Sequence, residues 1–310
     1  MTKLKAIKAP VAEEMQQFEG FFKTAMGSKV PLLGVITNYL LRRKGKQMRP
    51  LLVFLSARLT GEINKSTFYA ASFIELLHTA TLIHDDVVDE SFERRGYFSI
   101  NALWRSKIAV LVGDYLLSKG MLLAIEHEEF GLLRIVSHAV REMSEGELLQ
   151  LQKARKMNIN EETYFEVIRM KTATLIAACT ASGAKSAGAT DETVQKMKDF
   201  GQALGIAFQI KDDLFDYSKT NAIGKPTAND IKEKKMTLPL IYALEQAPAN
   251  ERAKIIRIVK HHRKNARKVQ DVIAFVKQYG GLEYARGKMF AYTQQAKDIL
   301  AGFPAGSTRE

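Results

Sequence analysis

The chain has 310 residues, of which 46% are hydrophobic, enough to bury a large core as one big domain or two ordinary ones. Its one cysteine, Cys179, excludes an intrachain disulfide and indicates a reducing compartment. The net charge is +12, but no nucleic-acid-binding motif accompanies it, so we expect no nucleic-acid partner.

The N-terminal segment has no features of a targeting sequence. Residues 1–22 lack an uninterrupted apolar stretch, and Glu13 and Glu14 disfavour a transit peptide. No segment elsewhere reaches the roughly 18 apolar residues of a membrane span. We therefore expect a soluble, cytoplasmic protein.

Proline placement and apolar periodicity predict a helical protein. The seven prolines leave residues 51–225 without one, which suits stacked helices. Apolar residues recur at three- and four-residue spacing in residues 73–89, 108–125 and 197–217, and strand alternation is nearly absent. No linker divides the chain. We predict a single all-α domain over residues 1–310, with about ten or more helices.

One short pattern occurs twice. Residues 84–90 read HDDVVDE and residues 211–217 read KDDLFDY, so each holds a DDxxD at the C-terminal end of an apolar helical run. In each copy the first and last aspartates lie one turn apart on one helix face, and the middle aspartate lies to the side. The two clusters are Asp85, Asp86 and Asp89, and Asp212, Asp213 and Asp216.

Carboxylates at the end of a buried helix need a neutralising partner. Like charges one turn apart destabilise a helix, and a buried charge is costlier still. Carboxylate ligands favour a hard cation, and Mg²⁺ completes its shell with water and phosphate oxygens. A solvated acidic face is the alternative for a single copy, but two copies on apolar helices favour metal. Zinc is disfavoured, because the six histidines show no HExxH-like spacing.

Basic side chains gather near the first cluster in the sequence. They are Lys46 and Arg49, before the first long apolar helices, and Arg94 and Arg95, after the cluster. Arginine and lysine are the side chains that bind diphosphates. His78 falls seven residues before Asp85, within about 20° of it on the same helix face. Each residue alone is typical of a surface charge or a satisfied histidine, but together they favour a phosphate site.

Several stretches occur in the order found in one enzyme family. They are GKQMRP, ELLHTATLIHDDVVDESFERRG, AVLVGDYLL, SEGELLQL, RMKTATL, GIAFQIKDDLFDY and GKPTANDIKEKKMTLPLIYAL. From about residue 15 to about residue 300 the chain resembles the trans-polyprenyl diphosphate synthases, most closely long-chain members such as heptaprenyl and octaprenyl diphosphate synthase. The resemblance implies the isoprenoid synthase fold, a helical bundle around a deep central cavity. The main departure is Arg105-Ser106, where many relatives have Gly-Asn.

The resemblance also implies a role for each matching residue. Asp85, Asp89 and Asp212 are expected to bind Mg²⁺ directly, while Asp86 supports them and Asp213 and Asp216 act largely through water. The allylic diphosphate is expected to bind Arg94, Lys171 and Lys225. Isopentenyl diphosphate is expected to bind Lys46, Arg49, His78 and Arg95. Thr172 and Gln209 are expected to face the developing allylic cation, and Lys235 is expected to lie near the leaving group.

The implied reaction uses about three Mg²⁺ ions per active site and no protein nucleophile. Metal and basic side chains stabilise charge on the departing pyrophosphate, so that the allylic C–O bond ionises. The double bond of isopentenyl diphosphate then attacks the cation, and a proton is lost. The resemblance further implies a homodimer.

Small side chains upstream of the first cluster indicate a long product. Ala80 and Thr81 stand where short-chain enzymes similar to farnesyl diphosphate synthase carry aromatic residues, so the tunnel for the tail stays open. Leu77, Ile74 and Phe73 lie deeper, and the floor is expected there or on a neighbouring helix. We expect roughly thirty to forty carbons, with a geranylgeranyl or farnesyl product as the alternative.

Other interpretations stay open. A terpene cyclase shares the first motif, but its second metal site has a different composition. A non-catalytic subunit of a heteromeric synthase would lose acidic or basic positions that are filled here. Residues 251–310 carry 13 Lys or Arg against 5 Asp or Glu. This excess predicts a solvated helix face, the favoured interpretation, or peripheral contact with anionic lipid during product release.

Overall fold

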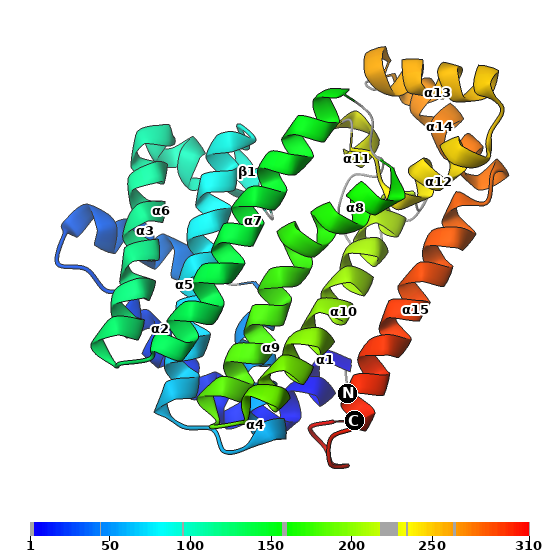
Figure 1. Cartoon of the computed structure of the whole chain (residues 1–310). Helices are drawn as coiled ribbons and strands as arrows, with labels where there is room; N and C mark the ends of the chain where they lie inside the picture. The colour runs from blue at the N-terminus through cyan, green and yellow to red at the C-terminus, as the bar shows by residue number, and fades with distance from the viewer. Residues whose placement is uncertain are drawn as a thin grey trace. The chain divides into compact units, whose positions relative to one another are not determined.

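The computed structural model describes residues 3–43, 45–94, 96–156, 160–217, 229–233, 235–262 and 265–309. These residues are almost entirely helical (Figure 1), which confirms the predicted all-α fold. The chain divides into two compact units, the first made of Met1–His138, Ala178–Lys198 and Phe303–Glu310, and the second of Ala139–Ala177 and Asp199–Gly302. One domain over residues 1–310 stays a prediction.

The first unit contains the N-terminal helices and the first aspartate cluster. Its elements are α1 (Lys3–Lys8), the 3₁₀ turn η1 (Ala9–Val11), α2 (Ala12–Ala25), α3 (Pro31–Arg42), α4 (Met48–Thr60), α5 (Lys65–Val88), β1 (Glu93–Arg94), β2 (Tyr97–Phe98) and α6 (Ile100–Glu126). In the described part of the chain, the only strands are β1 and β2, which pair as a short antiparallel hairpin.

Helix α5 is fixed at its N-terminal end by a capping box. The Asn64 side chain accepts the Ser66 N–H at 2.8 Å, and the Thr67 hydroxyl accepts the Asn64 N–H at 3.3 Å. The first aspartate cluster comes at the other end of this 24-residue helix.

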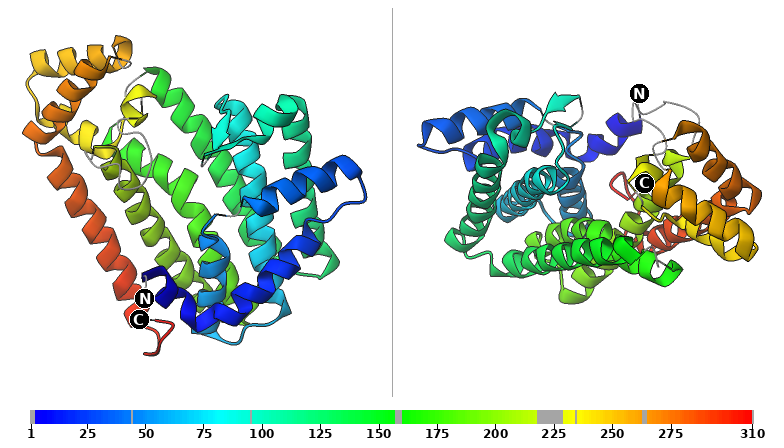
Figure 2. Two further views of the ribbon diagram at one scale, coloured as in Figure 1. Left: turned by 180° about the vertical axis from the view of Figure 1, so that it is seen from behind. Right: turned by 90° about the horizontal axis from the view of Figure 1, so that it is seen from above.

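Helices α5 and α6 lie side by side (Figures 1 and 2) and pack closely because glycines of α6 face α5. A Cβ at Gly113 would lie 2.1 Å from Nε2 of His84, and one at Gly120 would lie 2.6 Å from a ring carbon of Phe73. A larger residue at Gly120 would displace the buried ring of Phe73, whereas one at Gly113 would displace the half-buried side chain of His84.

Helix α6 has a kink at Arg105. Ser99 caps the helix by accepting the Ala102 N–H at 3.0 Å, and Arg105 then adopts φ 67° and ψ 163°. Glycine tolerates this conformation, whereas other residues are strained in it by about 1–3 kcal/mol. The departure Arg105-Ser106 therefore places a strained arginine at a position where glycine fits.

Helix α6 is also long and apolar enough to cross a membrane, by length and composition alone. An 18-residue window within Ile100–Glu126 has a mean hydropathy of 1.8, and 33% of that window is buried. This corrects the expectation that no segment of the chain reaches the length and hydropathy of a span. A core helix of a soluble protein passes the same test, so this one helix does not make the chain a membrane protein.

The second unit contains the second aspartate cluster and the C-terminal helices. Three helices, α7 (Phe130–Lys156), α9 (Thr174–Ser186) and α10 (Asp191–Asp216), contribute residues to both units. The remaining elements are α8 (Glu161–Ile168), the π-helical turn η2 (Arg169–Ala173), α11 (Asn229–Lys232), α12 (Leu238–Gln246), α13 (Ala249–His261), α14 (Ala266–Gln278) and α15 (Gly281–Ala301).

Helix α12 lies in the core of the second unit and packs against α14 and α15. The approach to α15 is close at Gly281, where a Cβ would lie 2.1 Å from the carbonyl oxygen of Pro239. Helix α13 buries Ile255, Ile258 and Val259 in the same core. Its basic residues are exposed and cover the outer face of this helix.

Candidate active site

The first aspartate cluster ends α5 and presents its three carboxylates differently. Asp86 is buried, with 4% of its surface exposed, whereas Asp85 is half-buried and Asp89, at the helix C-cap, is exposed. Arg94 of β1 donates to Oδ1 of Asp86 from Nε at 2.8 Å and lies 2.7 Å away through Nη2. Burial raises the pKa of Asp86, and Arg94 partly offsets the shift. Asp86, the middle aspartate, therefore fixes the position of the β1–β2 hairpin through Arg94.

The backbone after this cluster is tied to the kink in α6. The Asn101 amide donates to the carbonyl oxygen of Asp86 at 3.3 Å, and the Ser106 hydroxyl donates to Oδ1 of Asn101 at 2.9 Å. Ser106 directly follows the strained Arg105, so one of the two residues that depart from the family pattern supports the backbone of the first cluster through Asn101.

The predicted isopentenyl diphosphate residues occupy different environments in the first unit. His78 of α5 is buried at 8% exposure, Lys46 is exposed, and Arg49 of α4 is half-buried. Arg49 also acts on the buried Cys179, whose pKa burial raises to about 12, with Arg49 lowering it. Arg95 lies outside the described residues. The shared role of these four residues stays a prediction.

The predicted chain-length residues lie on buried or half-buried positions of α5. Phe73, Ile74, Leu77 and Ala80 are each at most 2% exposed, and Thr81 is half-buried. Phe73 is the residue that packs on Gly120. Ala80 lies seven residues later, within about 20° of Phe73 around the helix, and so faces the same side of α5.

The second cluster ends α10 with the same division between buried and accessible carboxylates. Asp213 is 4% exposed, Asp212 is exposed and Asp216 is half-buried. Asp213 accepts the hydroxyl of Tyr164 at 2.6 Å on Oδ2 and the amide of Gln209 at 2.8 Å on Oδ1. Burial raises the pKa of Asp213 to about 7, although both hydrogen bonds lower it.

The π-helical turn η2 presents Lys171 and Thr172. Lys171 forms an ion pair with Glu147 of α7, and Thr172 donates to Oε1 of Gln209 at 2.8 Å. Turns of this kind occur often at functional sites, because they re-aim side chains within a helix. Gly146 of α7 allows close packing here, since a Cβ would lie 2.7 Å from Cβ of Met170.

Acidic residues that the sequence interpretation missed surround Lys235 and Asp216. Asp230 donates its backbone N–H to Oδ2 of Asp216 at 2.9 Å, and its side chain lies 3.9 Å from Nζ of Lys235. Glu233 pairs with Lys235 at 2.6 Å. Burial, followed by Asp216, raises the pKa of Asp230 to about 6. Lys225 lies outside the described residues.

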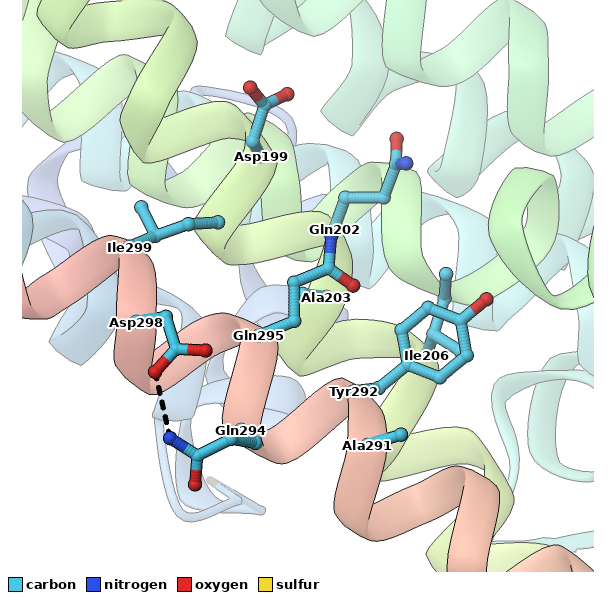
Figure 3. Close-up of a pocket in the computed structure, with 10 residues that line it drawn as sticks. All are labelled: Asp199, Gln202, Ala203, Ile206, Ala291, Tyr292, Gln294, Gln295, Asp298 and Ile299. Carbon is cyan, nitrogen blue, oxygen red and sulfur yellow. Dashed lines mark hydrogen bonds between the residues drawn. The ribbon is translucent and has the colours of Figure 1, made fainter.

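A pocket of about 740 Å³ lies elsewhere in the second unit, between α10 and α15 (Figure 3). Its lining residues are Asp199, Gln202, Ala203, Ile206, Ala291, Tyr292, Gln294, Gln295, Asp298 and Ile299. Gln294 donates to Asp298 at 2.7 Å across its rim. None of the predicted site residues lines this pocket, so it is not the predicted active site.

Residues 30–276 match the polyprenyl synthetase family. The chain belongs to this family. It is 36% identical to the all-trans-nonaprenyl-diphosphate synthase (geranyl-diphosphate specific) of Rhodobacter capsulatus, over 98% of this chain and 93% of that protein. It is 34% identical to the octaprenyl diphosphate synthase of Haemophilus influenzae, over 96% and 90%. A decaprenyl diphosphate synthase structure from Rhodobacter capsulatus matches with a TM-score of 0.92 and 37% identity, over 99% and 95%.

These matches confirm the predicted family, the isoprenoid synthase fold and the enzyme class, a prenyltransferase. The role of each site residue stays a prediction. Two residues that the sequence interpretation did not assign, Tyr164 on α8 and Asp230 on α11, form hydrogen bonds with aspartates of the second cluster. Tyr164 lies 49 positions from its partner Asp213, so no local pattern predicts the contact.

Proposed function

We propose that this enzyme condenses isopentenyl diphosphate with an allylic diphosphate in a Mg²⁺-dependent reaction, repeated to give a long-chain all-trans polyprenyl diphosphate. One observation carries most weight. In both clusters the middle aspartate is buried against protein donors, whereas the first and last are half-buried or exposed. This repeated arrangement leaves two accessible carboxylates in each cluster for cations that also bind a diphosphate.

The residues present fit Mg²⁺ better than a metal held by protein alone. Within the described ranges, no three His, Cys, Asp or Glu side chains are grouped to hold an ion. Mg²⁺ needs only one or two carboxylates, because water and substrate phosphate supply its other ligands. We assign Asp85, Asp89 and Asp212 as direct ligands of about three ions. Bound Mg²⁺ would stabilise negative charge on the departing pyrophosphate.

The basic residues assigned to the diphosphates are held in place by carboxylates. Arg94 bonds Asp86, Lys171 pairs with Glu147, and Lys235 pairs with Glu233. In our proposal Arg94 and Lys171 bind the allylic diphosphate and Lys235 lies near the leaving group. Their charged partners restrict their movement, so less conformational entropy is lost when a diphosphate binds.

Thr172 and Gln209 are assigned to the developing allylic cation. The Thr172 hydroxyl fixes the oxygen end of the Gln209 amide, and Asp213 fixes its nitrogen end. The amide and hydroxyl dipoles therefore hold one orientation before the substrate ionises, and oriented dipoles stabilise a developing charge without reorganisation.

The names of the relatives support a long product. Octaprenyl is at the upper end of the predicted range, and nonaprenyl and decaprenyl lie beyond it. The small side chains of Ala80 and Thr81 support the same conclusion, because aromatic residues at these positions would take up more volume beside α5. We therefore propose a product of about forty carbons, with a geranylgeranyl product as the alternative.

We also propose that two copies of the chain associate through α6. One face of this helix exposes six large apolar residues at helical spacing, each between 37% and 56% exposed. They are Leu103, Val110, Leu111, Met121, Leu122 and Ile125. Asp114 and Ser118 lie between Leu111 and Met121 on this face, so the exposed apolar residues form separate groups along the helix. Exposed apolar groups of this size are typical of a subunit interface. By sedimentation, Leu111→Glu is expected to convert a dimer to a monomer, whereas Glu126→Gln at the end of α6 is expected to leave it dimeric.

Location and membrane contact stay predictions. Helix α13 buries Ile255, Ile258 and Val259, whereas its basic residues are exposed and available to a lipid surface. Any contact there would depend on charge and weaken with salt. Flotation with anionic and neutral vesicles separates charge-dependent contact from a solvated helix face. The cytoplasmic location and the absence of a nucleic-acid partner stay predictions that rest on the sequence.

The direct test is incorporation of labelled isopentenyl diphosphate into lipid in the presence of farnesyl diphosphate and Mg²⁺. We expect elongation that EDTA abolishes. Asp85→Asn and Asp212→Asn are expected to lower the rate by at least about 100-fold, because even outer partners of a metal typically contribute 10–100-fold. Asp191→Asn, at the start of α10, is the matched control. No incorporation by the wild-type protein at any Mg²⁺ concentration would refute the proposal.

A further inference from the structure

Tyr164 of α8 contacts Asp213, the most buried aspartate of the second cluster. Its hydroxyl lies 2.6 Å from Oδ2 of Asp213, and both side chains are 4% exposed. Tyr164 forms no part of either aspartate motif or of the basic stretches around them. From this contact and the network around it, we infer that Tyr164 is a positioning residue that holds the second cluster in its metal-binding geometry.

Both carboxylate oxygens of Asp213 are used inside the protein. Tyr164 donates to Oδ2, Gln209 donates to Oδ1 at 2.8 Å, and Thr172 donates to the other end of the Gln209 amide at 2.8 Å. One line of hydrogen bonds therefore joins α8, α10 and η2. Asp213 is its central acceptor, so this aspartate acts as an anchor and leaves metal binding to its neighbour on the exposed side of α10.

Helix α8 is itself held in place at its first turn. Tyr284 of α15 donates to Glu161 at 2.7 Å and 2.8 Å, and Lys288 pairs with the same carboxylate at 3.0 Å. Tyr284 also stacks on Tyr242 of α12, with ring centroids 3.9 Å apart. These contacts hold α8, and with it Tyr164, in one position. A hydroxyl group held in this way favours one orientation of the carboxylate to which it donates.

Loss of the Tyr164 hydroxyl removes one of two donors from a buried carboxylate. Oδ2 of Asp213 then lacks its donor, and Asp213 and Gln209 are free to turn toward other partners. Asp212 is adjacent to Asp213 on α10, so a shift of Asp213 is expected to move Asp212 as well. The variant keeps the Asp212 carboxylate as a metal ligand but changes its position. Outer partners of this kind typically change metal affinity by about 10–100-fold.

The buried Tyr217 provides a matched control. It is 3% exposed, belongs to the same core cluster as Tyr164, and its hydroxyl shares a 2.8 Å hydrogen bond with Thr237 instead of an aspartate. Tyr164→Phe and Tyr217→Phe therefore each remove one buried hydroxyl from one core. Only the first removes a hydrogen bond to a carboxylate of the second cluster, because Tyr217 bonds Thr237.

The inference rests on the proposed function, and the test separates the two. Isothermal calorimetry with inorganic pyrophosphate in excess Mg²⁺ measures binding without turnover. We expect Tyr164→Phe to weaken binding by about 10–100-fold, with Tyr217→Phe within about twofold of wild type. If the wild-type protein binds no Mg²⁺-pyrophosphate, the proposed function fails. If wild type and Tyr164→Phe bind equally, the positioning role alone is refuted.

A double variant tests whether Tyr164 acts through Asp213. We expect Tyr164→Phe to add little to the loss caused by Asp213→Asn, because both changes disrupt one contact. Losses that multiply would show that Tyr164 acts independently, and would overturn the inference. If Tyr164→Phe does not fold, Asp213→Asn alone decides: wild-type binding by this variant would show that the anchor has no role in the site.

Discussion

The ring of Phe73 on α5 packs directly over Gly120 on α6, where a Cβ would lie 2.6 Å from a ring carbon. This contact sets the spacing between α5 and α6 slightly more than about three turns before the first aspartate cluster. It also means that Phe73, a predicted floor of the product tunnel, already packs tightly against the neighbouring helix.

Substitution of Gly120 by alanine is expected to lower the free energy of unfolding by about 1–3 kcal/mol, because the added methyl group overpacks this contact. The matched control is Gly287→Ala on α15, where nothing lies within 4 Å of the added Cβ. That change is expected to stabilise the protein by about 0.5–1 kcal/mol. Urea titration followed by circular dichroism measures both, and equal effects would contradict the packing argument.

Substitution of Ala80 by phenylalanine is expected to shorten the product. Ala80 is 1% exposed and shares a side of α5 with Phe73, so a ring at position 80 fills space nearer the acidic end of the helix. Chromatography of the products measures the length, with Ala80→Ser as the control that adds little volume. An unchanged product length would place the tunnel along another wall.

Arg105→Gly is expected to stabilise the protein. Relief of the strained φ of 67° gains about 1–3 kcal/mol, and the added freedom of glycine in the unfolded chain offsets about 0.5–1 kcal/mol of this gain. Arg105→Ala removes the same charge but keeps the strain, so it is the matched control. If the alanine variant gains as much stability as the glycine variant, charge and not backbone conformation explains the effect.

Cys179 is expected to resist alkylation in the folded protein. Burial raises its pKa to about 12, so at pH 8 only about one thiol in 10,000 is ionised. Because the folded state binds this proton more tightly than the unfolded chain, raising the pH above the ordinary thiol value of about 8.5 favours unfolding. Iodoacetamide labelling with and without urea measures the difference. Rapid labelling without urea would contradict the buried placement.

The sequence predicted the elements that depend on local periodicity. The apolar spacing placed the first cluster at the end of α5 and the second at the end of α10, as the structure has them. Helical geometry also set the middle aspartate of each motif apart from the other two. It did not show that the middle residues turn inward, because that depends on Arg94 and Tyr164 from other elements.

Features that depend on contacts between distant residues or on backbone strain could not be predicted from the sequence. The β1–β2 hairpin is two residues wide on each strand, too short for strand alternation to appear. The π-helical turn at Lys171 and the positive φ at Arg105 have no side-chain signature. Only the resemblance to a family with glycine at that position marked Arg105 as unusual.

Product analysis tests the central claim most directly. Purified protein is incubated with Mg²⁺, excess labelled isopentenyl diphosphate and, in parallel, dimethylallyl, geranyl or farnesyl diphosphate, and the dephosphorylated products are separated by reversed-phase chromatography. We predict one dominant all-trans species of about forty carbons from the accepted primers. A dominant fifteen-carbon product, or no product from any primer, would contradict the proposal that this chain is a long-chain polyprenyl diphosphate synthase.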